Sequence, residues 1–117
     1  MSGGVTEPGV LSLTRVGDEA RLALLIQPEL CWFEGHFRGT PLLPGVVQTH
    51  WAVVFGRRQF VLPPYFISMS NMKFSRFILP GMQIELQLNY AAAKRELSFE
   101  YREAAATCSS GNLSFAE

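Results

Sequence analysis

Residues 44–60 read PGVVQTHWAVVFGRRQF, and they predict the one long helix of the chain. A proline suits the first turn of a helix, because the first helical amides have no intrahelical acceptor. Before Gly56 the only polar side chains of this stretch are Gln48, Thr49 and His50. A helix that is apolar all round is a buried helix, so residues 46–60 predict one that would be about 22 Å long at 1.5 Å per residue.

Strands are predicted on both sides of this helix from the alternation of apolar and polar side chains. The clearest case is residues 82–90, where Ile84, Leu86 and Leu88 alternate with glutamine, glutamate and asparagine. Further strands are predicted at 10–16, 20–27, 65–74, 97–102 and 104–115. Two strands, one helix and four strands predict an α+β domain in which an antiparallel sheet wraps one long central helix.

Composition limits the classes of protein that the chain can belong to. Ten basic residues balance ten acidic ones among 117, which argues against general binding to nucleic acid or to an anionic membrane. No run approaches the roughly 20 apolar residues that span a bilayer. Cys31 and Cys108 lack the spacing of a metal site. We expect a soluble cytoplasmic protein with a flexible segment at 1–8 and a single domain at 9–117.

Most of the chemistry lies in a loop rich in proline and glycine just before the helix. Residues 33–48 read FEGHFRGTPLLPGVVQ. His36 lies in this loop, where an imidazole suits the role of a general base, with a merely packed histidine as the alternative. Gly45 opens the helix, so its N–H is a natural hydrogen-bond donor to a developing negative charge. For Gly35 and Gly39 the favoured interpretation is a tight turn alone.

These residues resemble the signature of the hot-dog-fold 3-hydroxyacyl-acyl-carrier-protein dehydratases. In that family a glycine-histidine-phenylalanine run leads to proline-glycine-valine at the head of the hot-dog helix. The resemblance is strongest to the short dehydratase-like proteins of aryl polyene pigment clusters, and it covers roughly residues 22–90. The other matching positions are His50-Trp51-Ala52, Lys73-Phe74 and Pro80-Gly81.

The resemblance implies a hot-dog fold and the dehydration of 3-hydroxyacyl thioesters to trans-2-enoyl thioesters in fatty acid or aryl polyene biosynthesis. The substrate would be carried on the 4'-phosphopantetheine of acyl carrier protein, with no metal or redox cofactor. The expected assembly is a homodimer, or a higher oligomer of dimers. The implied catalytic residues are His36, Gly45 and His50, and the implied substrate-binding residues are Phe37, Gly39, Pro44, Val46 and Trp51.

Two positions depart from the family pattern. Fourteen residues after the loop histidine, where the family has a carboxylic acid supplied by the partner subunit, this chain has His50. A protonated His50 would donate to the leaving hydroxyl, whereas the alternative is a hydrogen bond across the dimer; Glu34 is a less favoured acid. Arg38 replaces a proline. A basic rim for carrier protein would comprise Arg38, Arg57, Arg58, Lys73 and Arg76, with a merely solvated face as the alternative.

Two rival functions remain open on the sequence alone. An acyl thioesterase usually needs a carboxylate to activate water, yet residues 37–84 contain neither aspartate nor glutamate. The other rival is a non-catalytic or weakly active hot-dog subunit that binds acyl chains or pairs with an active paralogue. His50 and Arg38, the two departures from the family pattern, are compatible with such a subunit.

Overall fold

A computed structural model describes residues 5–30 and 42–117 of the chain. Two strands precede the single α-helix of this part and four follow it. The strands are β1 (Gly9–Val16), β2 (Glu19–Leu25), β3 (Tyr65–Phe74), β4 (Gln83–Ala91), β5 (Glu96–Glu103) and β6 (Ala106–Ala116). The helix is α1 (Gly45–Gln59), and a short 3-10 turn, η2 (Ala92–Lys94), joins β4 to β5.

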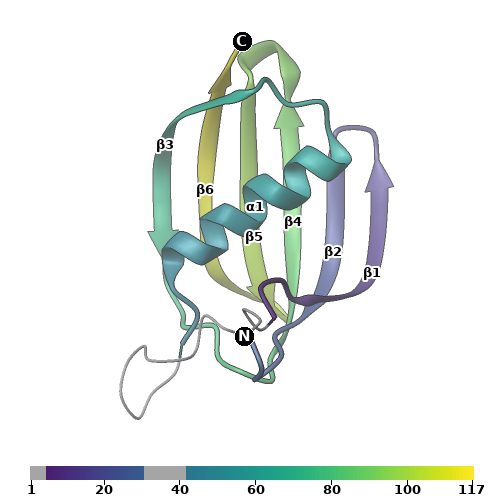
Figure 1. Cartoon of the computed structure of the whole chain (residues 1–117), viewed down its shortest axis with the longest axis vertical. Helices are drawn as coiled ribbons and strands as arrows, with labels where there is room; N and C mark the ends of the chain where they lie inside the picture. The colour runs from purple at the N-terminus through teal and green to yellow at the C-terminus, as the bar shows by residue number, and fades with distance from the viewer. Residues whose placement is uncertain (1–4, 31–41) are drawn as a thin grey trace.

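The strands form one antiparallel sheet in the order β1-β2-β4-β5-β6-β3, and α1 runs diagonally across one face of it (Figure 1). This is the predicted hot-dog architecture. The helix begins beside the end of β3, and β2 ends at the same end of the molecule (Figure 1). The positive end of the helix therefore lies at the same end of the sheet as the end of β2.

The central strands show why alternation was a good predictor. Leu86 of β4 pairs with Tyr101 of β5, and Leu88 pairs with Phe99, so the apolar residues of both strands share the face beneath the helix. Each large apolar side chain that is fully buried there stabilises the fold by about 1.5–3 kcal/mol. Gly56 allows α1 to approach this layer closely, since a Cβ atom at that position would lie 2.6 Å from Cδ2 of Leu97.

The N-terminal residues contact the helix. The indole N–H of Trp51 donates to the carbonyl oxygen of Thr6 at 3.1 Å. Arg58 makes two hydrogen bonds to the Glu7 carboxylate, at 3.0 and 2.8 Å. The last turn of α1 is thereby tied to the start of the described chain, next to the domain boundary predicted at residue 9.

The helix differs from the sequence prediction in one respect: it is not buried on every side in the single chain. Val46 is 76% exposed, and His50, Arg57 and Arg58 are exposed as well. Val46, His50 and Arg57 follow one another at spacings of four and seven positions, so they share the face turned away from the sheet, with Arg58 beside them. The sheet covers only one side of α1, which leaves an outer face carrying both apolar and titratable groups.

Candidate functional site

The turn that leads into α1 is held from two directions. The amide of Leu43 donates to the carbonyl oxygen of Ile78 at 2.9 Å. The carbonyl oxygen of Leu43 accepts a 3.0 Å hydrogen bond from Nε2 of Gln48. Pro44 has the extended backbone typical of a residue just before a helix, and its carbonyl oxygen accepts from the amides of Val47 and Gln48. The first turn of the helix is therefore fixed in place.

A buried polar network anchors this turn to the sheet. Oε1 of Gln48 accepts a 2.6 Å hydrogen bond from Oγ of Ser109, and the backbone oxygen of Gln48 accepts a 2.7 Å hydrogen bond from the Tyr101 hydroxyl. Burial raises the pKa of Tyr101 well above its usual value, so this phenol remains a donor. The sequence offered one signal, a glutamine on an otherwise apolar helix, but none that pointed to Ser109 or Tyr101.

The start of α1 carries the positive end of the helix dipole. Its first turn contains no acidic residue, and Pro44 provides no side-chain cap. The amides of Gly45 and Val46 come too early in the helix to have intrahelical acceptors. Together with the helix dipole, such amides favour negative charge at this point.

An apolar pocket lies beside these amides. We call it the helix-start pocket; it encloses about 270 Å³ and is lined by Gly45, Val46, Thr49, Met69, Met72 and Phe74. Gly45 is needed for close approach rather than for an unusual backbone angle, since a Cβ there would lie 2.9 Å from Cε1 of Phe74. Thr49 directs its hydroxyl back to the carbonyl oxygen of Gly45 at 3.0 Å. Gly45 thus lies next to both the polar amides of the helix start and the apolar pocket.

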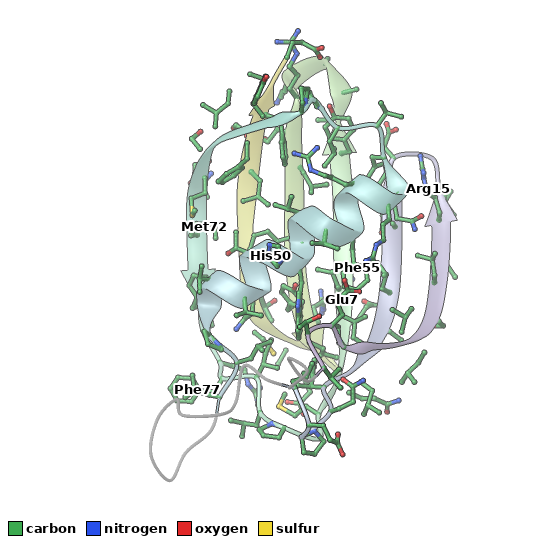
Figure 2. The ribbon with its side chains drawn as sticks, viewed as in Figure 1. Glu7, Arg15, His50, Phe55, Met72 and Phe77 are labelled. Carbon is green, nitrogen blue, oxygen red and sulfur yellow. The ribbon has the colours of Figure 1, made fainter. Side chains whose placement is uncertain are left out.

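The structure brings together only some of the predicted site residues. Gly45 and Val46 line the helix-start pocket, and Pro44 immediately precedes Gly45 in the chain. His50 lies farther along α1 on its outer, exposed face (Figure 2). Trp51 is in the core, with its indole bound to Thr6, and it is not among the pocket residues. His36, Phe37 and Gly39, together with Glu34, Gly35 and Arg38, lie outside the described residues.

The predicted basic rim is divided by the fold. Arg57 and Arg58 lie in the last turn of α1, where Arg57 donates to the carbonyl oxygens of Pro63 and Pro64. Lys73 and Arg76 lie near the other end of the helix, beside the Phe74 that covers Gly45. A helix of this length separates its two ends by about 22 Å. These four arginine and lysine residues therefore do not form one continuous patch.

A larger cavity lies on the opposite face of the sheet. It encloses about 500 Å³, and its lining includes Arg21, Lys73, Glu100 and several amide side chains. Such a polar lining suits an apolar acyl chain less well than the helix-start pocket does. In residues 5–30 and 42–117, no group of three histidine, cysteine, aspartate or glutamate side chains is placed to hold a metal ion. Within the same ranges, no helix has the length and hydropathy needed to cross a bilayer.

Comparison with known proteins assigns the chain to a class. Residues 12–112 match the ApeI-like family, described as ApeI dehydratase. The chain therefore belongs to the ApeI-like family of dehydratase-like hot-dog proteins. This finding confirms the resemblance noted in the sequence.

Solved structures and curated relatives agree with this assignment. One chain in the structure of the dehydratase heterocomplex ApeI:P from Xenorhabdus doucetiae superposes with a TM-score of 0.90 at 30% identity, and the match covers 96% of this chain and 100% of that chain. An uncharacterized protein from Erwinia carotovora subsp. atroseptica has a TM-score of 0.82 at 35% identity, covering 93% and 95%. The 3-hydroxyacyl-[acyl-carrier-protein] dehydratase FabZ of Symbiobacterium thermophilum is 32% identical over 56% of this chain and 51% of its own length. The match thus spans about half the length of that curated relative.

Proposed function

We propose that this protein dehydrates 3-hydroxyacyl thioesters on acyl carrier protein to trans-2-enoyl thioesters, in fatty acid or aryl polyene biosynthesis. The observation that carries the proposal is that Gly45 lies both in an apolar pocket and in the first turn of α1, whose amides have no intrahelical acceptor. A thioester presents those two features, a carbonyl oxygen that becomes negative in the transition state and an apolar acyl chain. Membership of the ApeI-like family supports the same reaction.

Each residue then has a chemical role. The Gly45 N–H donates to the thioester oxygen as the α-proton leaves, which stabilises the enolate-like charge. His36 takes the α-proton, and His50 of a partner subunit donates a proton to the departing hydroxyl. The exposure of His50 supports that last role, because a side chain on the outer face of α1 is available to a second chain. No metal or redox step is needed for this elimination.

The assembly that we propose is a homodimer formed through the β3 edge. β3 lies at the end of the sheet, and its neighbour β6 occupies only one of its two edges. Its exposed apolar residues are Tyr65, Phe66, Ile67, Met69 and Phe74. A long apolar edge strand is a template for pairing with another chain. The acyl carrier protein would deliver its phosphopantetheine arm to the helix-start pocket in the cytoplasm.

One observation favours a second candidate, a weakly active subunit that needs a paralogue. His50 stands where the dehydratases that the sequence resembles have a carboxylic acid, and the structural neighbour from Xenorhabdus doucetiae is a heterocomplex. In such a pair the partner chain would supply the missing acid. The β3 edge would serve a related hot-dog chain as well as a second copy.

A product assay separates the candidates. Purified protein is incubated with a 3-hydroxyacyl thioester, alone and with candidate hot-dog partners, and the products are followed by absorbance and by thiol release. We expect a conjugated enoyl thioester from the protein alone. Formation only with a partner would select the second candidate, and release of free thiol would indicate a thioesterase. The absence of any turnover between about pH 6 and 9, the range in which histidine changes charge, would overturn the catalytic proposal.

A further inference from the structure

Strand β3 carries an irregularity beside the helix-start pocket. Ser70 pairs with Asn112 of β6 and Lys73 pairs with Ser110, so two residues of β3, Asn71 and Met72, face the single residue between those partners. Asn71 has φ 54°, a left-handed conformation that asparagine tolerates better than most residues. This is a β-bulge, and bulges redirect side chains. Here the two residues point to opposite faces: Asn71 lines the cavity on the outer face, and Met72 lines the helix-start pocket.

The residue opposite Met72 is a glycine, and its missing side chain provides the space that Met72 fills. A Cβ atom at Gly111 would lie 2.1 Å from Sδ of Met72 and 3.0 Å from Cε2 of Phe99. Met72 is partly buried and packs against the hydrophobic core. Its side chain is therefore seated on the sheet at Gly111, between the core and the pocket. Figure 2 shows Met72 on β3, with α1 crossing in front of the sheet.

Gly45 and Gly111 each leave room for one side chain of β3, and these two side chains line different parts of the helix-start pocket. Phe74 covers Gly45, next to the helix amides. Met72 covers Gly111, on the sheet. A ligand whose polar group binds the amides would extend its apolar part past Phe74 and meet Met72. Methionine is flexible and fills irregular space, so it suits the end wall of a pocket for a linear chain.

We propose that Met72, seated on Gly111, forms the end of the helix-start pocket and limits the length of the acyl chain that the protein accepts. The inference rests on the proposed function, because it takes an acyl chain as the ligand. Shortening residue 72 deepens the pocket, whereas a side chain at residue 111 pushes Met72 into it. Opposite changes in preferred chain length are expected from the two substitutions.

The test measures binding rather than turnover. The probes are S-alkyl pantetheine thioethers, which can neither dehydrate nor hydrolyse, and affinity is measured by calorimetry as the alkyl chain is lengthened. In the wild type, affinity rises about fourfold with each methylene that enters the pocket and then stops rising. Met72→Ala moves that limit to longer chains by about three chain atoms, because the substitution removes three heavy atoms, Cγ, Sδ and Cε. Gly111→Ala moves it to shorter chains.

Controls separate this effect from a general loss of packing. Met82 is also partly buried against the core but does not line the pocket, so Met82→Ala leaves the limit unchanged. Met72→Val keeps more of the packing and moves the limit less than Met72→Ala, should the alanine variant fold poorly. An unchanged limit in the Met72 variants, or no dependence on chain length in the wild type, would overturn the inference. Failure of the proposed function would appear separately, as absence of turnover with 3-hydroxyacyl thioesters.

Discussion

Oγ of Ser109 donates a 2.6 Å hydrogen bond to Oε1 of Gln48, and both side chains are buried between α1 and β6. Nε2 of the same glutamine donates to the carbonyl oxygen of Leu43, just before the helix. One side chain therefore links the sheet to the turn that opens the candidate site. A buried polar group that loses its partner costs about 1–3 kcal/mol, so both ends of this link matter for stability.

Replacing Gln48 tests that link. Gln48→Leu leaves the Ser109 hydroxyl and the Leu43 carbonyl oxygen without their partner, and we expect it to lower the free energy of unfolding by about 3 kcal/mol. Urea unfolding followed by circular dichroism measures the change. Gln83→Leu is the matched control, because Gln83 is exposed on β4. Equal stabilities of the two variants would show that the hydrogen bonds of Gln48 contribute nothing to the free energy of unfolding.

The buried phenol of Tyr101 predicts a loss of stability in alkali. Burial raises its pKa above the value of about 10 that the unfolded chain has. At a pH between the unfolded and the native pKa of Tyr101, the unfolded chain releases a proton that the native protein keeps. The free energy of unfolding therefore falls as the pH rises above about 10. The contribution of this group is about 1.4 kcal/mol per pH unit.

Tyr101→Phe should remove that contribution to the slope, although it also costs the hydrogen bond to Gln48. The measurement is the free energy of unfolding at several pH values from about 8 to 11, spanning the ordinary tyrosine pKa. Tyr65→Phe, at a tyrosine that is 65% exposed, is the matched control. A Tyr101→Phe slope equal to that of the wild type would refute the assignment.

The packing of Phe74 on Gly45 predicts a separation of activity from stability. In Gly45→Ala the new methyl group displaces the Phe74 ring, which is 53% exposed in the single chain. We expect turnover to fall about tenfold, because the thioester oxygen no longer reaches the amide in the same geometry. The melting temperature should change little. Phe74→Ala in the same chain should recover part of the lost rate, and a Gly45→Ala variant as active as the wild type would contradict the role of this glycine.

The exposed β3 edge predicts where the subunits meet. Ile67 is 59% exposed, and Ile67→Glu would place a charge in the proposed interface, where burying an unpaired carboxylate is costly. We expect this variant to be monomeric by light scattering and to lose activity. Leu13→Glu, on the opposite edge strand β1, is the matched control because Leu13 is 45% exposed. A dimeric Ile67→Glu variant would place the interface elsewhere.

Much of this architecture was predictable because its signals are local. Alternation in residues 82–90 identified β4, and Pro44 located the start of α1 to within a residue. Long-range relationships were not predictable. Gln48 and Ser109 are 61 positions apart, and neither the bulge at Asn71 nor the seating of Met72 on Gly111 has a signature in a single sequence. Trp51 lies in the core, and its role in binding substrate stays a prediction, because the sequence pattern of an apolar residue is the same in either role.

Hydration of a short trans-2-enoyl thioester, the reverse of the proposed reaction, is the sharpest test of the proposed dehydratase activity. Loss of conjugated absorbance is followed for the wild type, His36→Ala and His50→Ala at the same concentration of folded protein. We expect measurable hydration by the wild type and at least about a hundredfold loss in each variant, the usual contribution of a general acid or base. A wild type that shows no hydration, or variants that hydrate the thioester at the wild-type rate, would rule out the proposed two-histidine dehydratase.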